Sequence, residues 1–183
     1  MSYEAALEKG WEDLSKLNPG EILAVKFLGD EYTVNFSEKK ILSLSCNVPA
    51  KDFAVILLLH YLAQKLKGLP ALTGEWMAFK ELSGIEGYYS AFRSRAIEPL
   101  IRKYGSHPEG ILEALDRLPA KKVDQGDVGI VLEAFAGVPV LITLWRSDDE
   151  FGPEVNMLFD KSITRIFCTE DIVVLAGFIA SQL

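Results

Sequence analysis

Aromatic and arginine side chains are interleaved between positions 88 and 95, and these residues are the best suited to binding chemistry in the sequence. On a helix, Tyr88, Phe92 and Arg95 share one face, and Tyr89 and Arg93 share another. Arginine forks fit carboxylates and phosphates, and tyrosine rings pack against flat groups. We therefore expect an anionic, ring-containing small molecule to bind here. The alternative is an amphipathic helix whose arginines are solvated.

Two tryptophans, at positions 76 and 145, are candidate walls of the same pocket. The predicted ligand-binding set is Trp76, Tyr88, Tyr89, Phe92, Arg93, Arg95 and Trp145. On this interpretation, replacing Arg95 with alanine weakens the binding of an anionic ligand and leaves the fold intact.

The other groups suited to catalysis or metal binding are isolated. His60 lies in an apolar helix, His107 lies in a turn, and Cys46 and Cys168 form no CxxC pair. Cys168 directly precedes a predicted helix, whose N-terminus lowers a thiol pKa. The acidic loop 148–150 offers oxygen ligands for a hard cation, without the spacing of an EF-hand. For each group we favour the structural interpretation, so no metal site is predicted, and the roles of both cysteines stay open.

Composition and charge exclude several classes of function. The 183 residues carry a formal net charge of −7, which disfavours binding to nucleic acids and to anionic membranes. The sequence contains no dinucleotide, nucleotide-phosphate, zinc-protease or serine-hydrolase motif. It shows no signal peptide and no apolar stretch of the ~20 residues that span a bilayer, so we expect a cytoplasmic protein.

The candidate residues must be positioned by helices that precede, separate and follow two groups of short strands. Apolar residues recur at helical spacing in residues 3–17 and 52–67, and the second of these helices is apolar on nearly all sides. The Asn-Pro-Gly run at 18–20 ends the first helix. The strands between the two helices form a predicted meander, at 22–27, 32–36 and 41–44, with its first turn at 29–30.

The second half of the chain has a similar pattern. A short strand is predicted within 75–82, and a helix over 84–96 is broken or kinked at Pro99. Residues 119–126 are interpreted as a loop, and Thr169 as the cap of the last helix. The remaining elements are helices at 100–104 and 108–118 and strands at 128–135, 138–145 and 155–159.

These elements predict an α+β fold, with two antiparallel β-meanders packed with an apolar central helix and a C-terminal helix. No repeat, low-complexity segment or linker interrupts the sequence. The length predicts one domain, residues 1–183, because domains usually contain about 50–250 residues.

Several segments of the second half resemble one family. They are Trp76 to Gly84, Tyr88 to Phe92, Gly126-Asp127, Leu144 to Phe151, Leu158 to Asp160 and Thr169 to Ile172. Together they resemble an uncharacterised prokaryotic family, the domain-of-unknown-function group DUF3786, over most of the chain. The resemblance implies a prokaryotic cytoplasmic setting and an accessory role in anaerobic redox or one-carbon metabolism. Some members resemble this chain fused to a cysteine-rich iron–sulfur segment, and this chain, with two cysteines, would leave any cluster to a partner.

Three classes of function stay open. The favoured one is a small-molecule or cofactor-binding accessory module, because the catalytic motifs are absent and the aromatic–arginine helix is present. A protein–protein adaptor would use the apolar C-terminal helix to bind a redox or iron–sulfur protein, or a second copy of the chain in a homodimer. A carboxylate-based enzyme, less favoured, would use Glu75, Glu81 or the Asp148 loop as acid–base groups. No cofactor is identified.

Overall fold

The computed structural model describes residues 3–17 and 20–183, and the chain divides into two compact units, Met1–Pro70 and Ala71–Leu183. Each unit contains one antiparallel sheet, of three strands in the first and five in the second. The fold class is therefore α+β, as predicted. That residues 1–183 form one domain stays a prediction, and the predicted helix stop at 18–19 lies outside the described residues.

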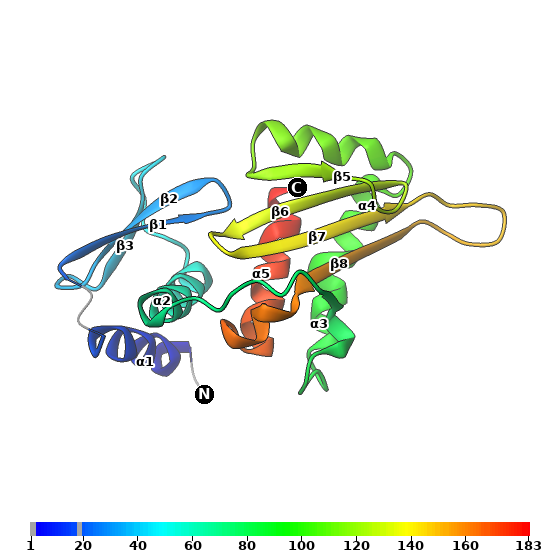
Figure 1. Ribbon diagram of the computed structural model, residues 1–183. Helices are drawn as coiled ribbons and strands as arrows, with labels where there is room; N and C mark the ends of the chain where they lie inside the picture. Colours follow the sequence, from blue (N-terminus) through cyan, green and yellow to red (C-terminus); the bar gives the residue numbers. More distant parts are fainter. Residues whose placement is uncertain (1–2, 18–19) are drawn as a thin grey trace. The chain divides into compact units, whose positions relative to one another are not determined.

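The first unit consists of two helices and a three-stranded meander (Figure 1). Its elements are α1 (Tyr3–Ser15), β1 (Ile22–Phe27), β2 (Asp30–Asn35), β3 (Lys40–Ser43) and α2 (Asp52–Lys67). All five predicted elements are present. The apolar helix α2 packs against α1 and β1. Gly10 of α1 allows a close approach, because a Cβ added there would lie 3.1 Å from Leu59 of α2.

The first hairpin of this meander turns one residue earlier than predicted. Phe27 pairs directly with Asp30, so the turn residues are Leu28 and Gly29. Both have positive φ, 49° and 85°, as a two-residue type I′ turn requires. Asp30 then belongs to β2, where its carboxylate accepts a hydrogen bond from the Ser43 hydroxyl at 2.6 Å.

The second unit is built on a sheet in which an early strand joins the edge of a later meander. The spatial order is β4-β8-β7-β6-β5, and every neighbouring pair is antiparallel. The strands are β4 (Trp76–Ala78), β5 (Ala120–Val123), β6 (Val128–Phe135), β7 (Val138–Trp145) and β8 (Glu154–Asp160). The α-helices are α3 (Tyr89–Phe92), α4 (Glu98–Tyr104) and α5 (Thr169–Gln182), and 3₁₀ segments lie at Phe79–Glu81, Pro108–Asp116 and Lys161–Arg165.

Strand β5 was not expected, since residues 119–126 were interpreted as a loop. Ala120–Val123 pairs with Gly129 to Leu132 of β6 and forms one edge of the sheet. Its central lysines are exposed. Lysine and proline are typical of edge strands, so the features that resembled a loop are those of a protected sheet edge.

The helix at residues 89–104 continues through Pro99 instead of breaking there. It begins as α3, widens into a π-helical turn at Arg93–Ile97 and resumes as α4. In the widened turn the Glu98 N–H donates to the Arg93 carbonyl, five residues earlier. Proline has no N–H to donate, and a wider turn gives its ring room beside the preceding turn of helix. The helix also starts later than predicted, at Tyr89.

The C-terminal helix α5 lies with α4 on one side of the five-stranded sheet (Figure 1). Its N-cap is Cys168 and not Thr169, which the sequence predicted. The main-chain N–H of Cys168 donates to the Asp171 carboxylate at 3.4 Å. The Thr169 hydroxyl instead donates to the Ser83 carbonyl at 2.8 Å. None of the helices in the described residues is long and apolar enough to cross a membrane.

Candidate functional site

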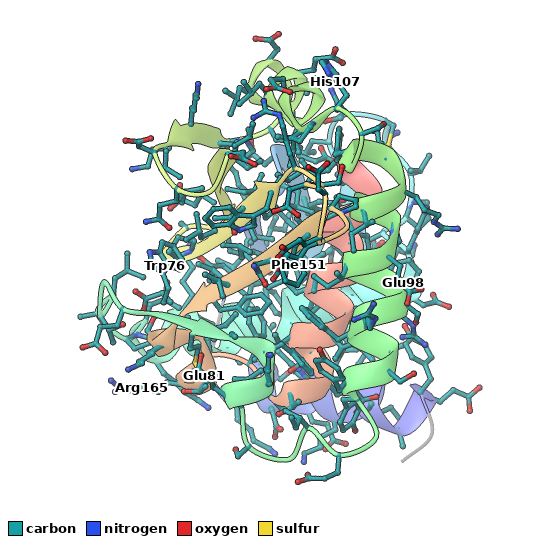
Figure 2. The ribbon with its side chains drawn as sticks, turned by 90° about the vertical axis from the view of Figure 1, so that its right-hand side faces the viewer. Trp76, Glu81, Glu98, His107, Phe151 and Arg165 are labelled. Carbon is teal, nitrogen blue, oxygen red and sulfur yellow. The ribbon has the colours of Figure 1, made fainter. Side chains whose placement is uncertain are left out.

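One cavity of the second unit is a cleft of about 300 Å³, named here the β8 cleft. It lies between the helix at residues 89–101, the chain at Ala78–Lys80, where β4 ends, and residues 153–158 in and just before β8. Figure 2 looks onto this side of the unit, with Glu98 on the helix and Phe151 near the start of β8. This volume is at the small end of the range for ligand pockets.

Aromatic rings form one end of the cleft. Phe79 and Phe92 stack face to face, with ring centroids 4.2 Å apart and an angle of 5° between the planes. Phe159 of β8 meets Phe92 at 6.4 Å, and Tyr89 lies 6.5 Å from Phe79. The two stacked rings are buried, whereas Tyr89 is 41% exposed and offers its ring to the cleft. A flat ligand group placed here would contact Tyr89 over a rigid aromatic base.

The charges around the cleft are distributed unevenly. Lys80 and Arg93 both line the cleft, and each is the chain neighbour of a ring at the aromatic end, Lys80 of Phe79 and Arg93 of Phe92. Both side chains are exposed, and the Arg93 Nε lies 3.4 Å from a Glu98 carboxylate oxygen. Glu154 lines the cleft at the start of β8. It lies four residues before Leu158, which pairs with Ala78 beside the aromatic end, and at the rise of an extended strand this separation is roughly 13 Å. The aromatic end is therefore the end suited to an anion.

Three of the seven predicted site residues line this cleft: Tyr89, Phe92 and Arg93. The four others, Trp76, Tyr88, Arg95 and Trp145, do not line it, and their part in binding stays a prediction. Tyr89 and Arg93 belong to the second of the two helix faces inferred from the sequence. Phe92 was assigned to the other face, with Tyr88 and Arg95, and it is the one residue of that predicted set of three that lines the cleft.

The residues outside the cleft have other neighbours. The Tyr88 hydroxyl donates to Glu170 at the start of α5, at 3.5 Å, and the Glu170 charge raises the pKa of Tyr88. The Cβ of Arg95 lies 3.4 Å from the position a side chain would take at Gly177, where the helix crosses α5 closely. Trp76 is half-buried on β4, opposite Asp160.

Trp145 ends β7 and borders a second hollow, formed with Asp127, Arg146 and the β7–β8 loop. The loop projects away from the sheet (Figure 1), and its Phe151 is 70% exposed. Asp148 shapes the loop, because its carboxylate accepts the N–H groups of Glu150 at 2.9 Å and Phe151 at 2.7 Å. These hydrogen bonds lower the pKa of Asp148.

The π-helical turn explains why residues four apart line one cleft. Tyr89, Arg93, Ile97 and Ile101 all face it. In a regular α-helix, positions four apart drift by about 40° per step around the axis, so the fourth would point well away from the first. The wider turn at Arg93–Ile97 counteracts that drift. Sequence reasoning missed the two isoleucines, although their spacing from Arg93 was a signal for them.

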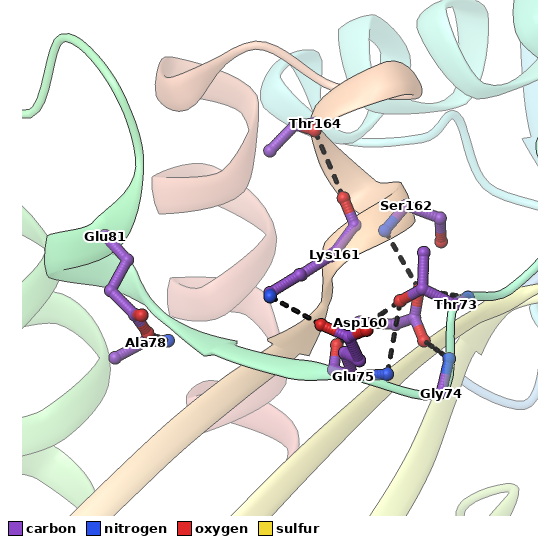
Figure 3. Close-up of polar contacts among 9 residues, drawn as sticks. All are labelled: Thr73, Gly74, Glu75, Ala78, Glu81, Asp160, Lys161, Ser162 and Thr164. Atoms are coloured by element: carbon purple, nitrogen blue, oxygen red, sulfur yellow. Dashed lines mark hydrogen bonds and ion pairs between the residues drawn. The ribbon is translucent and has the colours of Figure 1, made fainter.

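A buried carboxylate fixes the chain where it enters β4 (Figure 3). Asp160 is 3% exposed and accepts hydrogen bonds from the N–H groups of Thr73 (3.1 Å), Gly74 (2.8 Å) and Ser162 (2.9 Å), and from the Thr73 hydroxyl (3.0 Å). Burial raises the pKa of Asp160, but these hydrogen bonds outweigh burial and hold the pKa well below its usual value. β4 is thereby fastened to the end of β8.

The carboxylates proposed for acid–base chemistry each have a structural partner. Glu75 pairs with Lys161 at 2.6 Å, which raises the pKa of the lysine, and Glu81 accepts the Ala78 N–H at 2.5 Å (Figure 3). Asp148 binds its own loop as described. In the described part of the chain, no group of three or more His, Cys, Asp or Glu side chains converges as a metal site would require.

The environment of Cys168 reverses the expected shift of its thiol. Cys168 is exposed as a residue, but partial burial raises the pKa of its thiol, and the negative charge of Asp171 opposes ionisation further. The thiol lies 3.2 Å from the Asp171 carboxylate. The prediction that the helix N-terminus lowers this pKa was therefore wrong, because desolvation and a neighbouring anion outweigh the helix end. Cys46, in the first unit, donates its thiol hydrogen to the Ser43 hydroxyl at 3.2 Å.

Comparison with families of known sequence identifies one match. A family model described as a domain of unknown function, DUF3786, matches residues 14–182. No curated protein and no solved structure matches the chain. Because the family model covers most of the sequence, the chain belongs to the DUF3786 family of domains of unknown function.

Proposed function

We propose that this protein is a binding module whose β8 cleft takes a small anionic molecule with a flat group. Tyr89 and the stacked rings of Phe79 and Phe92 support the flat group, and Lys80 and Arg93 attract the anion at the same end of the cleft. An accessory role in the anaerobic metabolism of a prokaryote, in the cytoplasm, is the setting that accompanies this proposal, and its support is the resemblance described above.

The position of Arg93 is the observation that carries the proposal. The side chain is exposed at the cleft beside the aromatic end. Its Nε faces Glu98, while its two terminal amino groups have no hydrogen-bond partner within the described residues. Those groups form the fork that binds carboxylates and phosphates. Arg95, two residues along the same helix, is also exposed but does not line the cleft.

The two arginines provide a matched pair of variants. Phenyl phosphate and benzoate, which join a ring to an anion, are titrated by calorimetry at low ionic strength, with phenol as the uncharged control. We expect Arg93→Gln to weaken binding about tenfold, the value of one charge-assisted hydrogen bond of about 1.4 kcal/mol. Arg95→Gln removes the same charge from the same helix; because Arg95 does not line the cleft, we now expect this variant to bind as the wild type does, in contrast to the expectation from the sequence.

Two results would overturn the proposal. The first is the absence of binding by either aromatic anion at millimolar concentrations, since a cleft suited to this class should show at least weak affinity for its simplest members. The second is an equal loss of affinity in both arginine variants, because that result would reflect the net charge of the surface and not the geometry of the cleft.

A further inference from the structure

One edge of β8 is left without a partner strand along half its length. β7 pairs with β8 from Glu154 to Phe159, whereas β4 pairs with it only from Leu158 to Asp160. Residues 154–157 therefore have no neighbouring strand on the cleft side within the described residues, and this stretch of edge is also a wall of the β8 cleft.

The hydrogen-bond register shows which main-chain groups face the cleft. The Lys161 N–H donates to the Glu75 carbonyl at 2.9 Å, so residues 75 and 161 form a hydrogen-bonded pair at the start of the β4–β8 ladder. In an antiparallel ladder these pairs recur every second residue. The next pair joins Met77 to Phe159, and beyond the end of β4 the outward groups on β8 are those of Met157 and Val155.

Counting from the far edge of the sheet gives the same register. The Glu133 N–H donates to the Pro119 carbonyl, which makes the odd-numbered residues of β6 the ones bonded to β5. The alternation then passes through β7 and directs the even-numbered residues of β8 toward β7. The N–H and C=O groups of Val155 and Met157 again point into the cleft.

The main-chain N–H and C=O groups of Val155 and Met157 that face the cleft have no hydrogen-bond partner in the described part of the chain, although both residues are buried. Val155 and Met157 are only 4% and 2% exposed, so their main-chain groups open onto the confined cleft and not onto bulk water. No hydrogen bond to either residue from the cleft side is present in the described part of the chain. Main-chain groups that are buried without partners are rare in folded proteins, because their desolvation is costly.

The neighbouring edge, by contrast, is protected. The outward N–H of Ala78 on β4 is capped by the Glu81 carboxylate at 2.5 Å, and the 3₁₀ turn Phe79–Glu81 leads the chain away from β8 (Figure 3). Natural sheets cover or block their edges to prevent pairing with other chains. The gap beside Val155 and Met157 lies between this blocked edge and the helix at residues 89–101.

We infer that the anionic group bound in the β8 cleft belongs to an extended, acidic peptide segment, which adds to the sheet as a strand beside β8 and whose planar peptide groups are the flat groups of the ligand. Its main chain pairs with Val155 and Met157 in line with β4, and an acidic side chain or terminal carboxylate meets Lys80 and Arg93. The inference rests on the proposed function, because it takes the β8 cleft as the binding site, and it names the class of ligand. An uncovered strand edge can pair with the main chain of a peptide of any sequence, and Lys80 and Arg93 favour peptides with acidic side chains.

The probe is a phage-displayed library of random decapeptides, selected on the wild-type protein and counted again on variants. We expect enriched sequences to be acidic and rich in β-branched residues. Lys80→Glu and Arg93→Glu, at exposed positions, should each reduce binding of the best peptide at least about tenfold. Lys122→Glu, on the exposed opposite edge at β5, makes the same charge change and should have no effect.

A scan of main-chain N-methylation then separates strand pairing from other modes of binding. Methylation at alternate residues of the best peptide should weaken binding about tenfold or more, and methylation at the residues between should change it little, because only every second N–H faces β8. Amide hydrogen exchange at Val155 and Met157 should slow when the peptide binds.

Each contrary result has a distinct meaning. A library that yields no peptide sensitive to Lys80→Glu overturns the inference, and binding of phenyl phosphate by the same protein would leave the proposed function standing. A peptide that binds without alternation on N-methylation, or without slower exchange at Val155 and Met157, also overturns strand addition. Failure of both the peptides and the aromatic anions removes the cleft as a binding site altogether.

Discussion

Replacing Asp160 with asparagine tests whether hydrogen bonds to one buried carboxylate hold β4 in place. One carboxylate oxygen accepts the Thr73 N–H, the Thr73 hydroxyl and the Ser162 N–H, and the other accepts the Gly74 N–H at 2.8 Å. Asparagine keeps an oxygen for the first three donors, but its amino group then meets the Gly74 N–H, donor against donor. With the loss of one charged hydrogen bond and the weakening of three others, we expect the free energy of unfolding to fall by about 2–3 kcal/mol.

The same carboxylate makes the stability depend on pH. The pKa of Asp160 in the folded protein lies below its value in the unfolded chain, so the stabilisation is complete above about pH 4 and is lost progressively as the pH falls further. Urea unfolding of wild type and Asp160→Asn should therefore show a large difference near about pH 7 and a smaller one near about pH 3. Asp149→Asn, at an exposed loop position, is the control and should change stability little.

Two results would refute this reasoning. One is a difference below about 0.5 kcal/mol at neutral pH, the size of an ordinary surface substitution, which would mean that water replaces the carboxylate at no cost. The other is a difference in the free energy of unfolding that stays constant between neutral and acidic pH. Asparagine does not titrate, whereas the Asp160 carboxylate does, so the difference should shrink as the pH falls.

Two further predictions concern other parts of the second unit. Cys168 should be alkylated by iodoacetamide more slowly at neutral pH than the cysteine of a short unstructured peptide, because partial burial and the Asp171 carboxylate raise the pKa of its thiol. Peptide mass spectrometry measures the rate of alkylation. A rate equal to that of the free peptide would contradict the raised pKa. Gly126→Ala should destabilise the protein by about 1–2 kcal/mol or more, because Gly126 has a φ of 69° and the new Cβ would lie 3.0 Å from a carbonyl oxygen of β7. Gly152→Ala, with nothing within 4 Å of the added Cβ, is its control, and equal urea midpoints for the two variants would count against strain at Gly126.

Local signals in the sequence were sufficient for most of the fold. Strands β6 and β7 are apolar runs separated by Ala136-Gly137, and helix α2 is an apolar run that begins and ends where predicted. The errors occurred where one residue type fits two structures. Lysine and proline fit both a loop and the edge strand β5, and Pro99 fits both a helix end and a widened turn within a helix.

Half of the cleft could be predicted in the same way, and half could not. Tyr89 and Arg93 were grouped on one helix face because helical spacing is a local property of the sequence. The opposite wall, Pro153 to Leu158, faces that helix because β8 pairs with β4, about 80 residues earlier in the chain, and no local pattern specifies that pairing. Lys80 was missed for the same reason.

The charge of Glu81 accounts for where the cleft begins. If β4 continued beyond Ala78 in the same register, Glu81 would lie opposite Val155, on the face where Met77, Phe79 and Val155 are buried. Burying an ionised carboxylate there without a partner would cost far more than two or three ladder hydrogen bonds could return. The chain instead turns at Phe79–Glu81, where the carboxylate remains exposed and caps the Ala78 N–H. A single acidic residue thus stops β4 early, and the length of β8 it leaves uncovered becomes the wall of the cleft.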